Sequence, residues 1–256
     1  MAESPFDSAA QNFDDHYRQM RGYIRQNVTQ ANLNQTLHLI KSDRLRVLDL
    51  EGGAGYDADW LASIGHAVVL IDSSPHQLER AYGQAHLDKA SLIQGDIDTA
   101  LNLYGDTGFD LVLSHGALLY QSKPEEYITK LCNLVRPLGA LSLLTAAKLG
   151  KLQRFKQKGD QAAIDKLLLS SRYTNNLGLD ATAHLPNELT DLLVRQGFSR
   201  QAWFGVRIKS DEDRRPVDEV PVFHKNRILA EEIRLSKDRQ HRPQAQLLHF
   251  IAGRDT

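Results

Sequence analysis

Short apolar runs alternate with amphipathic stretches along the first 145 residues of the chain. The apolar runs predict strands, and the apolar residues at helical spacing between them predict helices. Strands that are apolar on both faces and are joined through helices are typical of a parallel sheet covered on both sides. The pattern therefore predicts an α/β fold with a Rossmann-like, doubly wound and mostly parallel sheet. The five expected strands cover residues 46–50, 67–71, 91–94, 109–114 and 141–145.

Helical spacing dominates before the first of these strands and after the fifth. Apolar positions predict N-terminal helices over residues 6–40, with Phe6 and Phe13 among the expected buried side chains. Between residues 146 and 185 the strand pattern disappears, and a basic run followed by an apolar helix replaces it. We therefore expect a helical insertion over the active-site edge of the sheet, within a single domain that spans residues 1–256.

The C-terminal part predicts one more helix and two more strands. The helix is expected over residues 187–196, with Gly197 as its C-terminal cap. The strands are expected at 200–209 and 246–253, with a charged and largely helical segment between them. These two strands are compatible with an antiparallel pair that completes the sheet.

Composition adds few constraints to this picture. The chain has 256 residues, 41% of them hydrophobic, and a formal net charge of −1, which weakens any case for non-specific binding of nucleic acid. No apolar run approaches the ~20 residues needed to cross a bilayer, and the N-terminus lacks the pattern of a signal peptide. We expect a cytoplasmic protein without a membrane partner. The single cysteine, Cys132, lies in an apolar helical pattern and is expected in the core.

The first expected strand ends in an acid and a cluster of glycines. The segment Val47-Leu48-Asp49-Leu50-Glu51-Gly52-Gly53-Ala54-Gly55 indicates a strand, a sharp turn and the start of a helix. Glycine is needed where a turn takes positive φ or where the backbone approaches a ligand. The second strand ends at Asp72, 23 residues after Asp49, where such units bind a ribose hydroxyl. The alternative is a βαβ crossover whose glycines only close the turn.

The charge of this turn decides between cofactors. Its spacing differs from the dinucleotide pattern G-x-G-x-x-G, Glu51 lies inside it, and Asp57 and Asp59 follow it. These carboxylates would offset the attraction of a helix N-terminus for a pyrophosphate. S-adenosylmethionine has no phosphate and carries a sulfonium and an ammonium cation, so that Asp49 and Glu51 suit it better. We predict S-adenosylmethionine as the cofactor, and no metal.

Several motifs resemble one enzyme family. V-L-D-x-x-G-G-x-G followed by I-D-S-S resembles the class I S-adenosylmethionine-dependent methyltransferases. G-Y-I-R at 22–25, L-S-H-G-A-L at 113–118, G-V-R at 205–207 and L-L-H-F-I-A at 247–252 make the chain similar to the bacterial tRNA carboxymethoxyuridine methyltransferases. That family esterifies the carboxylate of a modified wobble uridine in tRNA. The chain departs from the family at Glu51 and Leu138, where glycine is usual, and it matches poorly over 172–188.

The motifs and the resemblance together define an expected cofactor site. Its residues lie mostly in the turns after the first four strands, because ligands bind at the carboxyl ends of strands in such sheets. For Asp96, capping of the following helix is an alternative to contact with the adenine. The expected cofactor residues are Arg25, Asp49, Glu51, Gly52, Gly53, Gly55, Asp72, Ser73, Asp96, Ile97, Asp98 and His115.

The resemblance also implies a substrate-side role for Arg207, since arginine can hold a carboxylate with two parallel hydrogen bonds. A carboxylate is already a nucleophile at neutral pH, so methyl transfer to it needs alignment and no general base. We therefore predict no catalytic acid or base. Tyr120 could stack on an unpaired base. Lys148, Lys151 and Arg154 are either a solvated basic face or contacts to phosphates.

Three functions stay open at this point. The favoured one is methyl transfer to tRNA, which would be the partner. A methyltransferase for a small-molecule acceptor would keep the cofactor half and use the insertion as a lid. A non-catalytic binding protein is the third, because Glu51 stands inside the glycine turn. The sequence does not indicate an oligomeric state.

Overall fold

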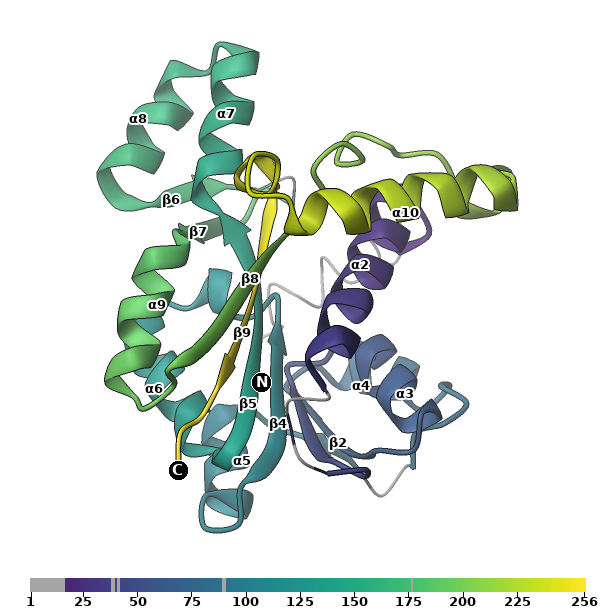
Figure 1. The fold of residues 1–256 in the computed structure, drawn as a ribbon, viewed down its shortest axis with the longest axis vertical. Coiled ribbons are helices and arrows are strands. Elements are labelled where there is room, and N and C mark those ends of the chain that lie inside the picture. The colour runs from purple at the N-terminus through teal and green to yellow at the C-terminus, as the bar shows by residue number, and fades with distance from the viewer. Residues whose placement is uncertain (1–16, 38–39, 41, 89–90, 176) are drawn as a thin grey trace.

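The computed structural model describes residues 17–37, 40, 42–88, 91–175 and 177–256. Its centre is a mixed sheet with the strand order β3-β2-β1-β4-β5-β7-β6 (Figure 1). β1 to β5 run parallel to one another, which confirms the predicted fold class. The strand order reverses between β1 and β4: β2 and β3 follow β1 on one side, and β5 follows β4 on the other. The bounds are β1 Arg46–Leu50, β2 Ala67–Asp72, β3 Leu92–Gln94, β4 Phe109–His115 and β5 Val135–Ala147.

Helices cover both faces of this sheet (Figure 1). One buried cluster joins the sheet to α2, α3 and α4, and a second joins it to α5, α6 and α9. Cys132 is buried in the second cluster, as predicted, and burial raises its pKa to about 12. The bounds are α2 Met20–Leu37, α3 Tyr56–Ser63, α4 Pro75–Ala81, α5 Ile97–Tyr104, α6 Pro124–Asn133 and α9 Pro186–Arg195.

The described part of the predicted N-terminal helices is α2, whose Ile24, Val28 and Leu33 are buried as expected. Phe6 and Phe13 lie outside the described residues. No helix within the described ranges combines the length and the apolar character that a membrane crossing needs.

The C-terminal strands pair as expected. β8 (Arg200–Val206) is antiparallel to β9 (Leu247–Gly253), and β9 is antiparallel to β5. β8 ends three residues before the predicted boundary, because Arg207 has a φ of 61° and leaves the extended conformation. Between the two strands, α10 (Val222–Lys237) packs against α2. The described residues also form the short 3₁₀ helices η2 Leu118–Tyr120, η3 Val217–Glu219 and η4 Arg242–Gln244.

The prediction that residues 146–185 contain no strands is wrong. The segment holds α7 (Lys148–Lys158) and α8 (Gln161–Ser170), followed by the antiparallel pair β6 (Arg172–Thr174) and β7 (Asp180–His184). β7 also extends the sheet by pairing with the end of β5. The sequence of these strands has too few large apolar residues to show an alternation, and their register depends on contacts with α8 and β5.

The fifth strand is longer than predicted and contains a bulge. Val135 pairs with Phe109, but the next pair on β4 is Leu111 with Ala140, so that the predicted turn at 136–140 bulges out of the strand. Leu138 lies in this bulge with a φ of 65° and is exposed. Its backbone thus adopts the left-handed conformation in which glycine carries no steric cost.

Candidate active site

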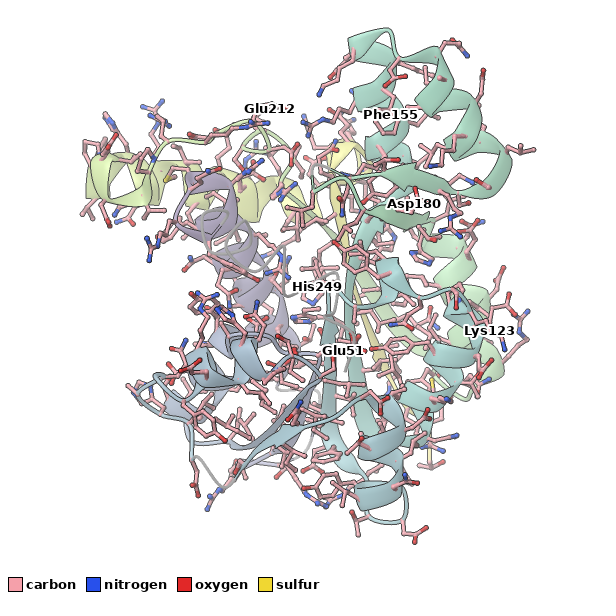
Figure 2. The ribbon with its side chains drawn as sticks, turned by 180° about the vertical axis from the view of Figure 1, so that it is seen from behind. Glu51, Lys123, Phe155, Asp180, Glu212 and His249 are labelled. Atoms are coloured by element: carbon pink, nitrogen blue, oxygen red, sulfur yellow. The ribbon has the colours of Figure 1, made fainter. Side chains whose placement is uncertain are left out.

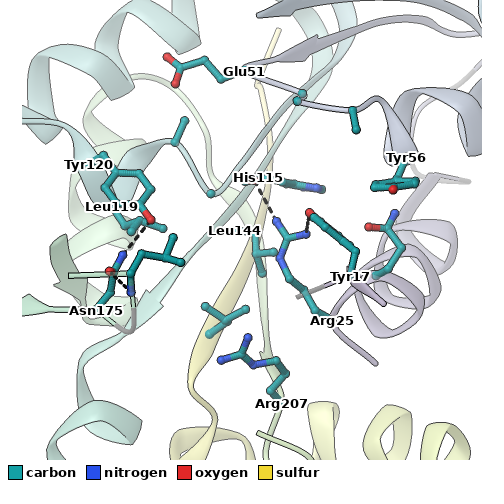
Figure 3. A pocket seen from close by; sticks show the side chains of 18 of the residues that line it. Tyr17, Arg25, Glu51, Tyr56, His115, Leu119, Tyr120, Leu144, Asn175 and Arg207 are labelled. Carbon is teal, nitrogen blue, oxygen red and sulfur yellow. Dashed lines mark hydrogen bonds between the residues drawn. The ribbon is translucent and has the colours of Figure 1, made fainter. Parts of the chain in front are cut away.

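A pocket of about 590 Å³ opens at the carboxyl ends of β1, β2 and β4. This edge includes the point where the strand order reverses, which is where ligands bind in open α/β sheets. Glu51 lies on one side of the pocket and Arg207 on the opposite side, with Arg25, His115 and Leu144 between them (Figure 3). The pocket therefore has a carboxylate side and a basic side.

The carboxylate side is built by the turns after β1 and β2. Gly52 faces the end of β1 so closely that a Cβ there would lie 2.6 Å from the carboxyl group of Asp49. The carboxylate of Asp72 accepts hydrogen bonds from the backbone N–H groups of Gly53, at 2.8 Å, and of Ser74, at 2.9 Å. The two turns are thereby fixed to each other, and both line the pocket.

The acids on this side are tuned by burial and by one another. Burial, followed by the charges of Asp57 and Asp72, raises the pKa of Asp49 well above its ordinary value. Burial, with Asp72 and Asp96, raises the pKa of Glu51 to about 7. A pocket side lined by carboxyl groups fits a cofactor that presents cations and hydroxyl donors, and it would repel a diphosphate. These residues therefore fit S-adenosylmethionine.

Glu51 has a φ of 55°, a conformation that favours glycine. The chain therefore keeps a left-handed turn at the position where the resembling family has glycine, and a charged side chain comes with it. Strained positions of this kind persist where the surrounding structure holds them, often at functional sites.

His115 stands at the end of β4, between the two sides of the pocket. Its Nδ1 lies 2.9 Å from Oδ2 of Asp57, at the start of α3. Its backbone carbonyl accepts a hydrogen bond from Nη2 of Arg25 at 3.1 Å, and Arg25 also donates to Tyr17 (Figure 3). Arg25 and His115 are thus in contact, and their binding of the cofactor stays a prediction.

Arg207 dominates the basic side. Its buried guanidinium forms an ion pair with Asp211, and Asp211 also pairs with Arg154. Glu232 of α10 fixes the loop that carries them, because its carboxylate accepts from the backbone N–H groups of residues 208, 209 and 210 at 3.0, 2.8 and 2.7 Å. The guanidinium is therefore held in place by its own ion pair and by the loop.

Lys151 is the second cation of this side. Its Nζ donates to Gln246 Oε1 at 3.3 Å and lies 5.2 Å from the centroid of the Tyr173 ring. Burial, followed by the charges of Arg207 and Arg154, lowers its pKa to about 7. Within the described part of the chain no carboxylate forms an ion pair with Lys151. An anionic ligand would supply the missing negative charge.

The pocket brings together most of the predicted residues. On the cofactor side these residues come from α2, from the turns after β1 and β2, and from the end of β4. On the acceptor side they come from η2, α7 and the end of β8. The predicted residues that line it are Arg25, Asp49, Glu51, Gly52, Gly53, Asp72, Ser73 and His115, with Tyr120, Lys151, Arg154 and Arg207.

Five predicted residues do not belong to the described lining of the pocket. Gly55 shapes the turn with a φ of 77°, and Lys148 donates to Ser171 Oγ at 2.8 Å. The other three form the segment 96–98. There Asp96 caps α5 by accepting from the Thr99 N–H at 3.0 Å, which is the alternative role considered for it. Contact of this segment with the cofactor stays a prediction.

Sequence reasoning missed several residues of the site. Asp57 was read only as a charge near the turn, although its place in the first turn of α3 was a signal for a pocket contact. Asn175, between β6 and β7, donates to the hydroxyl of Tyr120 at 2.9 Å and lines the pocket. Glu232 gave no local signal, because the backbone N–H groups that it accepts from belong to a distant loop. Asp211 has Arg207 as a partner four residues away, but its second partner, Arg154, comes from α7.

The chain matches a family model described as methyltransferase domain over residues 41–194, more than half of its length. It is 33% identical over 150 residues to the tRNA 5-carboxymethoxyuridine methyltransferase of Escherichia coli strain K12, covering 56% of this chain and 57% of that protein. It is 32% identical over 104 residues to 2-methyl-6-phytyl-1,4-hydroquinone methyltransferase 1 of Oryza sativa subsp. japonica, covering 39% of this chain and 30% of that protein. The matches thus span little more than half of the bacterial relative and less of the plant one.

A solved structure from Thermotoga maritima, described as a SAM-dependent methyltransferase and possible histamine N-methyltransferase, has the same fold. Its TM-score is 0.64 at 13% identity, and the superposition covers 98% of this chain and 99% of that one. The family match, the fold and the carboxylate-lined pocket agree. The chain belongs to the methyltransferase domain family of S-adenosylmethionine-dependent methyltransferases, and its cofactor is S-adenosylmethionine.

Proposed function

We propose that the protein transfers a methyl group to the carboxylate of a modified wobble uridine in tRNA. The observation that carries the proposal is the basic side of the pocket, where Arg207 lies opposite Glu51 (Figure 3). Lys151 also lines the pocket, close enough to Arg207 for the charge of Arg207 to act on it. Lys151 is a buried cation that no described carboxylate pairs with. An acceptor with a carboxylate would complete this side electrostatically.

The chemistry asks little of the protein beyond placement. S-adenosylmethionine supplies, when bound, an electrophilic methyl group on a sulfonium. Arg207 and Lys151 would hold the acceptor carboxylate so that one oxygen faces that methyl group, and no proton has to be removed from it. The acids and His115 on the other side would orient the cofactor. Binding of the acceptor on one side and of the cofactor on the other is consistent with a site that needs no general base.

Support for tRNA as the carrier of the carboxylate comes from the E. coli relative, whose name specifies a tRNA carboxymethoxyuridine. The proposal that Lys148, Lys151 and Arg154 follow the phosphates is weakened, because Lys151 and Arg154 belong to the pocket wall and Lys148 does not. We therefore assign Lys151 and Arg154 to the acceptor group itself. Contact with phosphates would fall to other cations that line the pocket, such as Lys158 and Arg21.

A small-molecule acceptor is the second candidate. The rice relative, whose name specifies a hydroquinone, matches 39% of this chain. α7, β6 and the turn after β6 line the pocket and would serve as a lid. A small carboxylic acid would satisfy the same two cations.

The test uses the purified protein, S-adenosylmethionine and tRNA from a strain that lacks the corresponding gene. Mass spectrometry of the nucleosides should show the methyl ester at the wobble position, and R207Q should reduce it strongly. R195Q, which changes an exposed arginine on α9, is the matched control and should leave it unchanged. If the tRNA gains no methyl ester and a small carboxylic acid is methylated instead, the second candidate replaces the proposal.

A further inference from the structure

Four hydrogen-bonded side chains lead from the pocket into the sheet. Asp57 Oδ2 lies 2.9 Å from His115 Nδ1, and His115 Nε2 lies 2.9 Å from Ser142 Oγ. Ser142 Oγ in turn lies 2.8 Å from Nε2 of His249. Ser142 of β5 and His249 of β9 are fully buried, with His249 in the interior of the molecule (Figure 2). Only Asp57 and His115 line the pocket.

The pocket end sets the direction of these hydrogen bonds. Although burial acts in the opposite direction, the hydrogen bonds from His115 and Gln26 and the charge of Arg25 lower the pKa of Asp57. Asp57 is therefore a carboxylate that accepts, and His115 Nδ1 carries the proton. In a neutral ring Nε2 then accepts from the Ser142 hydroxyl, whose oxygen accepts from the Nε2–H of His249. Each bond has one donor and one acceptor.

The buried end favours the same direction. Nδ1 of His249 is buried with no hydrogen-bond partner in the described structure. If His249 Nε2 donates to Ser142, this Nδ1 atom carries only a lone pair. If Ser142 donates to Nε2 instead, Nδ1 carries a proton and is a buried N–H without an acceptor. Orphaned N–H groups are the rarer and costlier case. Burial also lowers the pKa of His249 well below its ordinary value, so the ring holds a single proton.

We propose that Ser142 and His249 are positioning residues of the cofactor site, which keep His115 neutral and Asp57 ionised. A second proton on His115 would force Ser142 to donate to His249, and His249 to place its proton on the partnerless Nδ1. The guanidinium of Arg25, which donates to the His115 carbonyl, opposes a second positive charge as well.

The consequence concerns the charge that the cofactor meets. With His115 neutral, the negative charge of Asp57 acts on the pocket, while an imidazolium next to it would cancel that charge. S-adenosylmethionine has a cationic sulfur and S-adenosylhomocysteine a neutral one. The four side chains therefore favour the methyl donor over the spent cofactor, whatever the acceptor is.

The first test reads the protons directly. Long-range ¹H–¹⁵N NMR of the full chain, with the two rings assigned through H115Q and H249Q, should show His115 protonated at Nδ1 alone and His249 at Nε2 alone at neutral pH. A doubly protonated His115, or His115 protonated only at Nε2, would overturn the proposal without any reference to activity.

The second test is calorimetry of both ligands with S142A and S114A. Ser114 of β4 is equally buried, and its hydroxyl bonds with Tyr127 away from the histidines, so S114A is a matched control. S142A should weaken S-adenosylmethionine about tenfold and S-adenosylhomocysteine less than about threefold, and S142T should restore the difference. S114A should leave the ratio of the two affinities unchanged. Equal losses for both ligands in S142A would show that the hydroxyl only supports packing.

Discussion

The ionised side chain of Glu51 should lower the stability of the folded protein, although it is expected to help bind the cofactor. Its pKa rises from 4.5 to about 7, mainly because the side chain is buried and secondarily because Asp72 and Asp96 are near. The unfolded chain ionises this group near its ordinary pKa, whereas the folded chain holds the proton until about pH 7. Stability attributed to Glu51 is therefore fully present below pH 4.5 and is lost as the pH rises through 7.

The size of the effect follows from the shift. One pKa unit corresponds to about 1.4 kcal/mol, which gives roughly 3 kcal/mol at most, and solvent in the open pocket reduces this to about 2 kcal/mol. E51Q removes the titration, so its free energy of unfolding should exceed that of the original chain by about 2 kcal/mol more at pH 8 than at pH 4.5. For a chain of this size that is a difference of roughly 4–8 °C in melting temperature.

The assay is thermal or urea unfolding of the free protein across this pH range, with E79Q as the control, since Glu79 is exposed on α4. The comparison uses only the pH-dependent part of the difference in free energy of unfolding between E51Q and the original chain. A difference that is constant with pH reports other effects of the new side chain. The same E51Q should bind S-adenosylmethionine more weakly at pH 8. A stability difference that is the same at both pH values would refute the reasoning.

Three further predictions concern the rest of the pocket. D72N should weaken binding of S-adenosylhomocysteine by roughly 1.5–3 kcal/mol, measured by calorimetry; an unchanged affinity would make the acid a purely structural clamp of the two turns. Because the pKa of Lys151 is lowered to about 7, its positive charge is lost as the pH rises through that value, so the KM of an anionic acceptor at saturating cofactor should rise above pH 7. K151M should have a high KM that no longer changes with pH, and a pH dependence retained in K151M would assign it to another group. E232Q should lower the free energy of unfolding by about 2 kcal/mol and raise the KM of the acceptor, because three N–H groups lose a charged acceptor; E231Q, at the exposed neighbouring position, should do neither.

The local sequence was sufficient for the cofactor half of the protein. The five parallel strands follow from short apolar runs, because strands buried on both faces consist mostly of apolar residues. The turn at Glu51-Gly52-Gly53 follows from its glycines, because Gly52 has no room for a Cβ and Gly53 has a φ of 58°. Asp72 follows from its position at the end of the next strand. These features depend on residues close in sequence or on the regular βαβ repeat.

The acceptor side and the hydrogen bonds behind His115 depended on the tertiary structure. Ser142 and His249 are 107 residues apart, and they meet only because β5 and β9 pair in one register. Arg207 and Lys151 were recognisable as cations, but their burial and their lowered pKa values arise only on folding. The ion pair of Arg154 with Asp211 and the hydrogen bond of Lys151 to Gln246 likewise join segments that are distant in sequence. Burial converts such residues from solvated charges into groups that require a partner, and the sequence alone carries no measure of burial for an isolated polar residue.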